Sequence, residues 1–329
     1  MTPGPRNSLA DVAGLRVGHA GAGRTGTTVV VADVANVCSY FVMGGAPGTR
    51  DTDLLSPENS VESVDALFLS GGSAFGLDAG GGAQAALARM GRGFPVGAAR
   101  VPIVPGAILF DLHGGTPWDD EPPYRRLGEA AVDAASEGFA LGSVGAGIGA
   151  TVGNAEPAVL RGGIGTASAV AADGTTVAAL VAVNAVGAPA LGPHLRAARF
   201  ERDREFGGLG VSSALEADIA TKLGAAAGGN TTIGIVATDA ALTKAQAKRL
   251  ATVAHDGLAH AIWPAHTPLD GDLLFALATG RQPAPNLAGL LELGALAAAV
   301  VARAVARGVW EAASDKGHAP TFRAVHGLA

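Results

Sequence analysis

The segment Gly228-Gly229-Asn230-Thr231-Thr232 combines residue types that can cut a peptide bond. A threonine hydroxyl is a poor nucleophile until a base removes its proton, and a chain's own α-amine, with an unperturbed pKa of roughly 7.7–8.0, can be that base. Thr231 would then have to become a first residue, which requires cleavage between Asn230 and Thr231. The two glycines permit the tight backbone in which the Thr231 hydroxyl attacks the Asn230 carbonyl. The competing interpretation, which the pattern alone favours, is a turn that leads into a buried strand.

Asp270-Gly271-Asp272 is the second candidate, because carboxylates two residues apart can reach one cationic or hydroxylic group. An exposed acidic loop is the simpler interpretation, since Pro268 and Gly271 are typical turn residues. A metal site is a weaker alternative, because we find no histidine or further carboxylate at ligand spacing nearby. Asn184 is a third candidate, at the end of a predicted strand over 176–184, where turn residues are also common.

Several separated motifs follow one another along nearly the whole chain. They are Gly44-Gly45-Ala46-Pro47-Gly48-Thr49-Arg50, Leu69-Ser70-Gly71-Gly72-Ser73-Ala74-Phe75-Gly76-Leu77-Asp78-Ala79, Pro102-Ile103-Val104-Pro105, Gly145-Ala146-Gly147, Gly162-Gly163-Ile164-Gly165 and Asn230-Thr231-Thr232. With them the chain resembles the DmpA-like family of L-aminopeptidase/D-amino-acid esterase-amidases, which includes the nylon-oligomer hydrolases. The resemblance implies an α/β fold, the αββα-layered sandwich of the N-terminal-nucleophile type. It also implies a precursor that cuts itself into chains 1–230 and 231–329, which stay together as one domain and assemble into a homotetramer.

The same resemblance assigns roles to the candidate residues. Thr231 matches the nucleophile of the nylon-hydrolase branch, and Asn184 matches an asparagine that helps to form the oxyanion hole. Asp270 and Asp272 match a pair that accepts hydrogen bonds from the nucleophile's amine and hydroxyl. A small amide or peptide is the implied substrate, and no cofactor is implied.

Two positions depart from the family pattern. Many members carry a tyrosine where this chain has Phe110 and a lysine where it has Asn154, and both residues are linked to catalysis in relatives. We therefore expect these residues to border a pocket and to affect rate or substrate class. A binding protein on the same fold remains an alternative, as does an acyltransferase, because N-acetylornithine transferases also cleave themselves before a threonine.

Composition limits the other functional classes. The formal net charge of -6 disfavours nucleic-acid binding, and the Gly71–Gly76 loop lacks the signatures of a nucleotide site. The eight histidines show no metal-binding spacing, and His113 is expected to be a loop residue. One cysteine, Cys38, rules out an intrachain disulfide, and the N-terminal residues lack the apolar core of a signal peptide, so we expect a cytoplasmic protein.

The elements that must position these residues follow from periodicity. We predict strands over 27–34, 66–69, 164–170, 176–184 and 231–238, and helices over 74–90, 128–136, 243–261 and 287–307. Apolar strands that alternate with helices indicate sheets covered on both faces. The apolar stretch 287–305 contains Glu292 and Arg303, which favours a buried helix over a membrane span. With 48% hydrophobic and only 16% charged residues, the chain is expected to bury surface in an oligomer.

Overall fold

The computed structural model describes residues 1–116, 118–154, 159–214, 230–313 and 319–328. The first two residues of the candidate cleavage motif, Gly228 and Gly229, lie outside the described residues. Asn230 and all the other candidate site residues lie within them.

One large sheet organises the described part of the chain. Its nine strands follow the order β10-β11-β14-β15-β2-β4-β7-β3, and β1 pairs with β2 beside this path. The strands are β1 (Leu15–Ala22), β2 (Thr25–Val42), β3 (Thr49–Arg50), β4 (Ser63–Ser70), β7 (Gly106–Ile108), β10 (Gly163–Val170), β11 (Thr176–Val183), β14 (Ile233–Ala240) and β15 (Leu273–Gln282). Three two-stranded sheets are attached: β5 (Phe94–Val96) with β6 (Ala99–Val101), β8 (Thr151–Val152) with β9 (Leu160–Arg161), and β12 (Ala190–Leu191) with β13 (His194–Leu195).

The long strand β2 divides the sheet into two halves. Residues 27–31 and 36–37 of β2 pair with β4, with a register shift between Val31 and Asn36, and residues 37–42 pair with β15. Apolar side chains of the two halves meet in one core, in which Val30 and Leu67 belong to the same cluster as Leu180 and Phe275. The sheet therefore folds over on itself and forms two packed layers.

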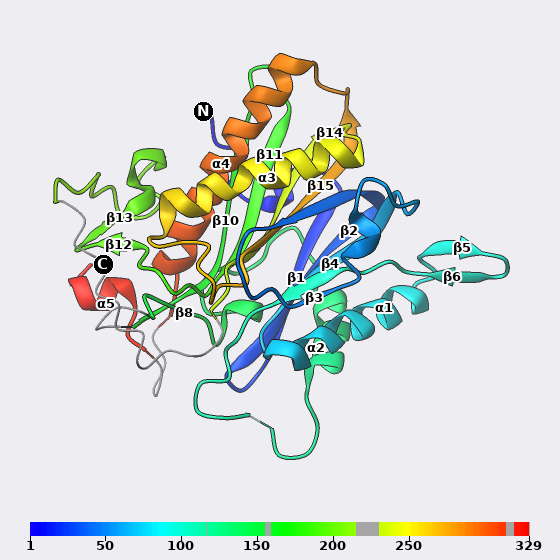
Figure 1. Ribbon diagram of the computed structural model, residues 1–329, viewed down its shortest axis with the longest axis horizontal. Helices are drawn as coiled ribbons and strands as arrows, with labels where there is room; N and C mark the ends of the chain where they lie inside the picture. The colour runs from blue at the N-terminus through cyan, green and yellow to red at the C-terminus, as the bar shows by residue number, and fades with distance from the viewer. Residues whose placement is uncertain (117, 155–158, 215–229, 314–318, 329) are drawn as a thin grey trace.

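Helices cover both outer faces (Figure 1). Helices α1 (Ala79–Arg89) and α2 (Tyr124–Asp133) pack on the half with β1, β2 and β4, while α3 (Lys244–Ala261) and α4 (Leu287–Trp310) pack on the other half. A short helix, α5 (Phe322–His326), follows α4. The four layers are the predicted αββα sandwich, so the fold prediction is confirmed.

All the predicted elements exist, with changes at their ends. Thr243 and Gln246 form the expected capping box at the start of α3. The predicted helix 74–90 begins instead as a 3-10 helix over Ser73–Asp78, because Gly72 enters it with a left-handed φ of 88°. The predicted helix 128–136 begins earlier, at Tyr124, and the first predicted strand extends to Val42.

Helix α4 is the one candidate membrane span among the described residues. It has 24 residues, a mean hydropathy of 1.8, and 67% of its most apolar window buried. It packs on β10 and β11 and belongs to the main hydrophobic cluster. Its burial identifies it as the predicted core helix.

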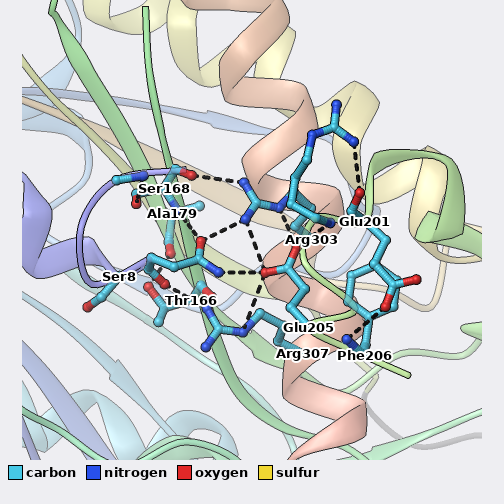
Figure 2. Close-up of polar contacts among 12 residues, drawn as sticks. Ser8, Thr166, Ser168, Ala179, Glu201, Glu205, Phe206, Arg303 and Arg307 are labelled. Atoms are coloured by element: carbon cyan, nitrogen blue, oxygen red, sulfur yellow. Dashed lines mark hydrogen bonds and ion pairs between the residues drawn. The ribbon is translucent and has the colours of Figure 1, made fainter. Parts of the chain in front are cut away.

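A buried polar network fixes α4 to the sheet (Figure 2). The Arg303 guanidinium, fully buried, donates to Glu205 Oε1 at 2.5 Å and Oε2 at 3.0 Å, and to Ser168 O at 2.8 Å. Arg303 also donates to Asn7 Oδ1 at 2.7 Å, and Arg307 donates to the Asn7 and Thr166 carbonyls. These contacts tie the N-terminal segment and the 201–208 loop to α4.

Candidate active site

The threonine motif at 230–232 and the acidic motif at 270–272 meet because they precede β14 and β15, which are parallel neighbours. Parallel strands start at the same edge of a sheet, so the residues just before each strand lie side by side. Asn230 forms a parallel bridge with Asp270, and Leu273 N donates to Thr232 O at 3.2 Å. The fold thus brings together motifs that are 40 positions apart.

Thr231 is held at the bond that the sequence marks for cleavage. Its hydroxyl donates to the Asn230 carbonyl oxygen at 2.6 Å, while Gly271 N–H donates both to that oxygen, at 3.0 Å, and to Thr231 Oγ1, at 3.1 Å. Thr231 N–H donates to Asn184 O at 2.5 Å. The Asn230 carbonyl therefore already accepts a hydrogen bond from a backbone N–H, which is the arrangement that stabilises a developing oxyanion.

Two glycines, Gly271 of the acidic motif and Gly44 of the Gly44-Gly45 motif, allow the backbone to approach this closely. A Cβ on Gly271 would lie 2.6 Å from Ala46 O and 2.7 Å from Thr231 Oγ1. A Cβ on Gly44 would lie 2.3 Å from Asp270 O. The segment Gly44-Gly45-Ala46 therefore packs directly on the Asp270–Asp272 turn. This packing brings a glycine pair that is distant in the sequence into the site.

Both carboxylates are buried next to the threonine segment. Asp272 Oδ1 accepts from Thr232 N–H at 2.8 Å, and Asp272 Oδ2 accepts from His266 N–H at 3.0 Å and from His266 Nδ1 at 2.8 Å. Asp270 accepts from Thr267 N–H at 2.8 Å and Val186 N–H at 3.3 Å. Burial, together with the negative charge of Asp272, raises the pKa of Asp270 above its ordinary value.

These carboxylates lie next to the Thr231-Thr232 segment, although no hydrogen bond joins them to Thr231 N–H. In the uncut chain that nitrogen is an amide with one hydrogen, which Asn184 O already accepts. Cleavage would turn it into an amine with more hydrogens, and the next amide along the chain, that of Thr232, already donates to Asp272 Oδ1. The predicted role of Asp270 and Asp272 in orienting the amine stays a prediction for the processed protein.

Asn184 is fully buried with a fixed side-chain orientation. Its Nδ2 donates to Phe110 O at 3.0 Å, and its Oδ1 accepts from Thr151 N–H at 2.9 Å. A side-chain amide carries a second N–H, which remains the predicted oxyanion donor. Phe110 thus acts on Asn184 through its backbone carbonyl, while its ring packs edge-on against His113 at 5.2 Å between centroids.

Asn154 contacts Asn230, the residue directly before Thr231. Its Nδ2 donates to Asn230 Oδ1 at 2.5 Å and to Ala185 O at 3.1 Å, and its Oδ1 accepts from the Thr151 hydroxyl at 3.1 Å. The position where relatives carry lysine therefore touches the Asn230 side chain in this protein.

A pocket of about 330 Å³ opens beside these residues. It is lined by Arg24, Asp111, His113, Gly149, Thr151, Asn154, Val159 and Ala319. His113, for which the sequence favours a loop position over the border of a cleft, lies in a turn and also lines this pocket, and burial together with Arg24 lowers its pKa. The pocket shares Asn154 and Thr151 with the contacts around Asn230 and Asn184, so it adjoins the candidate cleavage site.

Asp111 is a buried carboxyl that the sequence interpretation missed. Its Oδ1 accepts from Gly72 N–H at 2.7 Å, and burial raises its pKa to about 6 despite this bond. Only its partner at Gly72, 39 positions away, shows that the carboxyl turns inward.

His266 was also missed, since the sequence interpretation found no histidine at ligand spacing near the acidic pair. Its ring contacts Asp272, but within the described ranges no group of three or more His, Cys, Asp or Glu side chains is arranged to hold a metal ion.

A two-layered sheet between helices, with a threonine at the start of a central strand, defines the class of N-terminal-nucleophile hydrolase folds. Residues 7–321 match the model of peptidase family S58, and the chain belongs to this family. It is 44% identical to an uncharacterized aminopeptidase of Mycobacterium tuberculosis, over 96% of this chain and 97% of that protein. It is 27% identical to a 6-aminohexanoate-oligomer endohydrolase of Agromyces sp., over 93% of this chain and 85% of that protein.

Solved structures agree on the fold. The L-aminopeptidase D-Ala-esterase/amidase of Ochrobactrum anthropi, described as a new variant of the Ntn hydrolase fold, superposes with a TM-score of 0.72 at 20% identity, covering 98% of this chain and 93% of that one. A Burkholderia sp. β-aminopeptidase gives 0.68 at 23% identity, covering 98% and 92%. The chain is thus a member of a peptidase family on an Ntn hydrolase fold, as its motifs predict.

Proposed function

We propose that this protein is a self-processing amide hydrolase whose nucleophile is Thr231. The observation that carries the proposal is the cluster at the Asn230–Thr231 bond, where the Thr231 hydroxyl and Gly271 N–H both contact the Asn230 carbonyl oxygen. A nucleophile next to a carbonyl that already has a backbone donor is the minimum requirement for acyl transfer.

Self-cleavage starts with attack of Thr231 Oγ1 on the Asn230 carbonyl carbon. The oxygen of that carbonyl takes up negative charge and is stabilised by Gly271 N–H. The C–N bond then breaks, the hydroxyl proton passes to the leaving nitrogen, and the Asn230 acyl group remains as an ester on Thr231. Water hydrolyses the ester and leaves chain 1–230 with a carboxyl end and chain 231–329 with a free α-amine.

The new amine completes the catalytic site. It accepts the Thr231 hydroxyl proton while Oγ1 attacks a substrate carbonyl. The Asn184 side chain donates to the oxyanion, and Asp270 and Asp272 orient and stabilise the protonated amine. The amine then protonates the leaving group, and water releases the acyl group. No cofactor takes part in this scheme.

A small amide or peptide is the substrate class that fits best. The relatives are named as aminopeptidases or as an endohydrolase of 6-aminohexanoate oligomers, and the pocket beside Asn154 has the size for one or two residues of such a chain. The two processed chains would remain one folded unit, because β14 and β15 lie between β11 and β2 of the larger chain.

Mass analysis of the denatured wild-type protein tests the proposal. We expect two chains, the smaller beginning Thr231-Thr232-Ile233, and hydrolysis of members of an amide library. Thr231→Ala should stay uncut and inactive, whereas Thr231→Ser keeps a hydroxyl and should retain part of both activities. Normal cleavage in the alanine variant would place the nucleophile elsewhere.

The two alternatives give different results. A binding protein would stay intact as one chain and leave every amide and ester unchanged. An acyltransferase would be processed, but it would release the acyl group on an added amine acceptor much faster than on water.

A further inference from the structure

The His266 side chain contacts Asp272 Oδ2, whereas Thr232 N–H contacts Oδ1 of the same carboxylate. We propose that His266 is a positioning residue, whose imidazole holds one oxygen of Asp272 so that the other stays on the Thr232 amide and fixes Thr231 for attack. This inference rests on the proposed function, since it concerns the alignment of the same nucleophile.

Asp272 divides its two oxygens between two partners. Oδ2 accepts both N–H donors of His266, from the backbone at 3.0 Å and from Nδ1 at 2.8 Å. Oδ1 is therefore left for Thr232 N–H, at 2.8 Å. A carboxylate with donors on only one oxygen can rotate about its Cβ–Cγ bond, whereas donors on both oxygens fix its plane.

The environment makes the imidazole donor valuable. Asp272 is 2% exposed and neighbours Asp270, whose own pKa rises partly because of the Asp272 charge. A buried carboxylate that loses a donor pays the full cost of desolvation. Without the Nδ1 donor, Asp272 Oδ2 would keep only the His266 backbone N–H, so the carboxylate would be held less firmly and its contact with the Thr232 amide would weaken.

His266 is itself locked in place. Its backbone has a φ of 57°, a left-handed conformation that side chains rarely adopt, and its ring packs edge-on against His255 at 5.1 Å between centroids. His255 is held in turn by Phe41 O, 3.0 Å from its Nε2. Nδ1 carries the proton that is donated to Asp272. Packing against His255 fixes the orientation of the His266 ring, and this contact in turn fixes the orientation of the Asp272 carboxylate.

The left-handed backbone also provides a matched pair of variants. Asparagine tolerates this conformation better than most residues, and its Nδ2 falls where histidine Nδ1 lies. Glutamine places its amide one bond farther out, near the position of histidine Nε2. His266→Asn therefore keeps the donor, His266→Gln displaces it, and His266→Leu removes it. His260→Leu, on the outer part of α3, controls for loss of an imidazole.

The first measurement is amide hydrogen exchange at Thr232 in the uncut Thr231→Ala protein, which needs no activity. We expect exchange at least tenfold faster in the Leu and Gln variants, and unchanged in the Asn and His260→Leu variants. The second is turnover of the processed proteins on an amide substrate. We expect kcat to fall tenfold or more in the Leu and Gln variants, to stay within about threefold in the Asn variant, and KM to change little throughout.

Equal exchange at Thr232 in all variants would overturn the inference, as would an Asn variant as impaired as the Leu variant. If the Leu variant does not fold, the Asn and Gln pair decides the question. An uncut, inactive wild-type protein would overturn the proposed function instead, while the exchange experiment would still report on the contact between His266 and Asp272.

Discussion

Two buried clusters in this molecule differ in the charges that they bring together. Around Arg303, a guanidinium faces the Glu205 carboxylate, and carbonyl and amide oxygens accept its remaining N–H groups. Around Thr231, two carboxylates lie side by side and are compensated by backbone N–H groups and one imidazole. Opposite charges in the first cluster attract each other, whereas burial and the like charge of Asp272 raise the pKa of Asp270 in the second. The first arrangement is that of a structural network, and the second is the one we propose to orient an amine.

The largest effect should come from breaking the balanced cluster. Arg303→Met leaves Glu205 buried with only part of its partners, so we expect the free energy of unfolding to fall by about 3–5 kcal/mol. Urea unfolding in the uncut Thr231→Ala background measures this with a single chain. Adding Glu205→Gln should recover part of the loss, because it removes the uncompensated charge. A loss below about 1 kcal/mol would show that the network contributes little to stability.

Asp111 allows a test of the cost of an uncompensated carboxyl. Its pKa rises from 3.8 to about 6 in the folded protein, so the folded state binds more protons than the unfolded state between these values. Stability therefore falls as pH rises through this window, by roughly 3 kcal/mol in total. Asp111→Asn has no such proton to lose. The variant should gain stability relative to wild type between pH 4 and pH 6.5, and parallel pH profiles of unfolding would contradict this.

The acidic pair should affect rate more than stability. Asp270→Asn and Asp272→Asn preserve shape but remove charge, so at least one should slow turnover by tenfold or more, on the order of 1.4 kcal/mol of barrier. Activity should survive chelators. Loss on chelation and rescue by a divalent ion would replace the amine-orienting role with a metal site, and wild-type rates in both variants would remove the pair from catalysis.

The positions of most strands and helices can be predicted from the sequence, because they depend on local patterns. The roles of Asn230 and Thr231 rest on the family resemblance and stay a prediction. The apolar runs of β10, β11 and β14 and the capping box at Thr243 are visible in a few residues. Strand β15 was missed although it follows Asp272 directly, since its apolar run does not differ from that of a helix. His266 and Asp111 were missed because their roles depend on partners that only the folded sheet supplies. Their contacts could not be read from spacing alone.

The smallest expected effect is at Phe110, which differs from the tyrosine of many relatives. Losing one oxyanion donor typically costs roughly 10²–10³ in kcat, so a protein with phenylalanine here must be slow, use other donors, or act on a substrate that needs none at this point.

The structure shows that Phe110 supports Asn184 through its backbone carbonyl, which a tyrosine would keep. Its ring contacts His113, which lines the pocket together with the second departure, Asn154, while Phe110 itself is not a lining residue. We therefore favour an altered substrate, and we expect Phe110→Tyr to leave turnover of the native substrate unchanged or slightly lower. Activity on ordinary aminopeptidase substrates should rise instead. Rates on a panel of amides, with Phe200→Tyr as the matched control, measure the difference, and a large gain on every substrate would indicate a simply impaired enzyme.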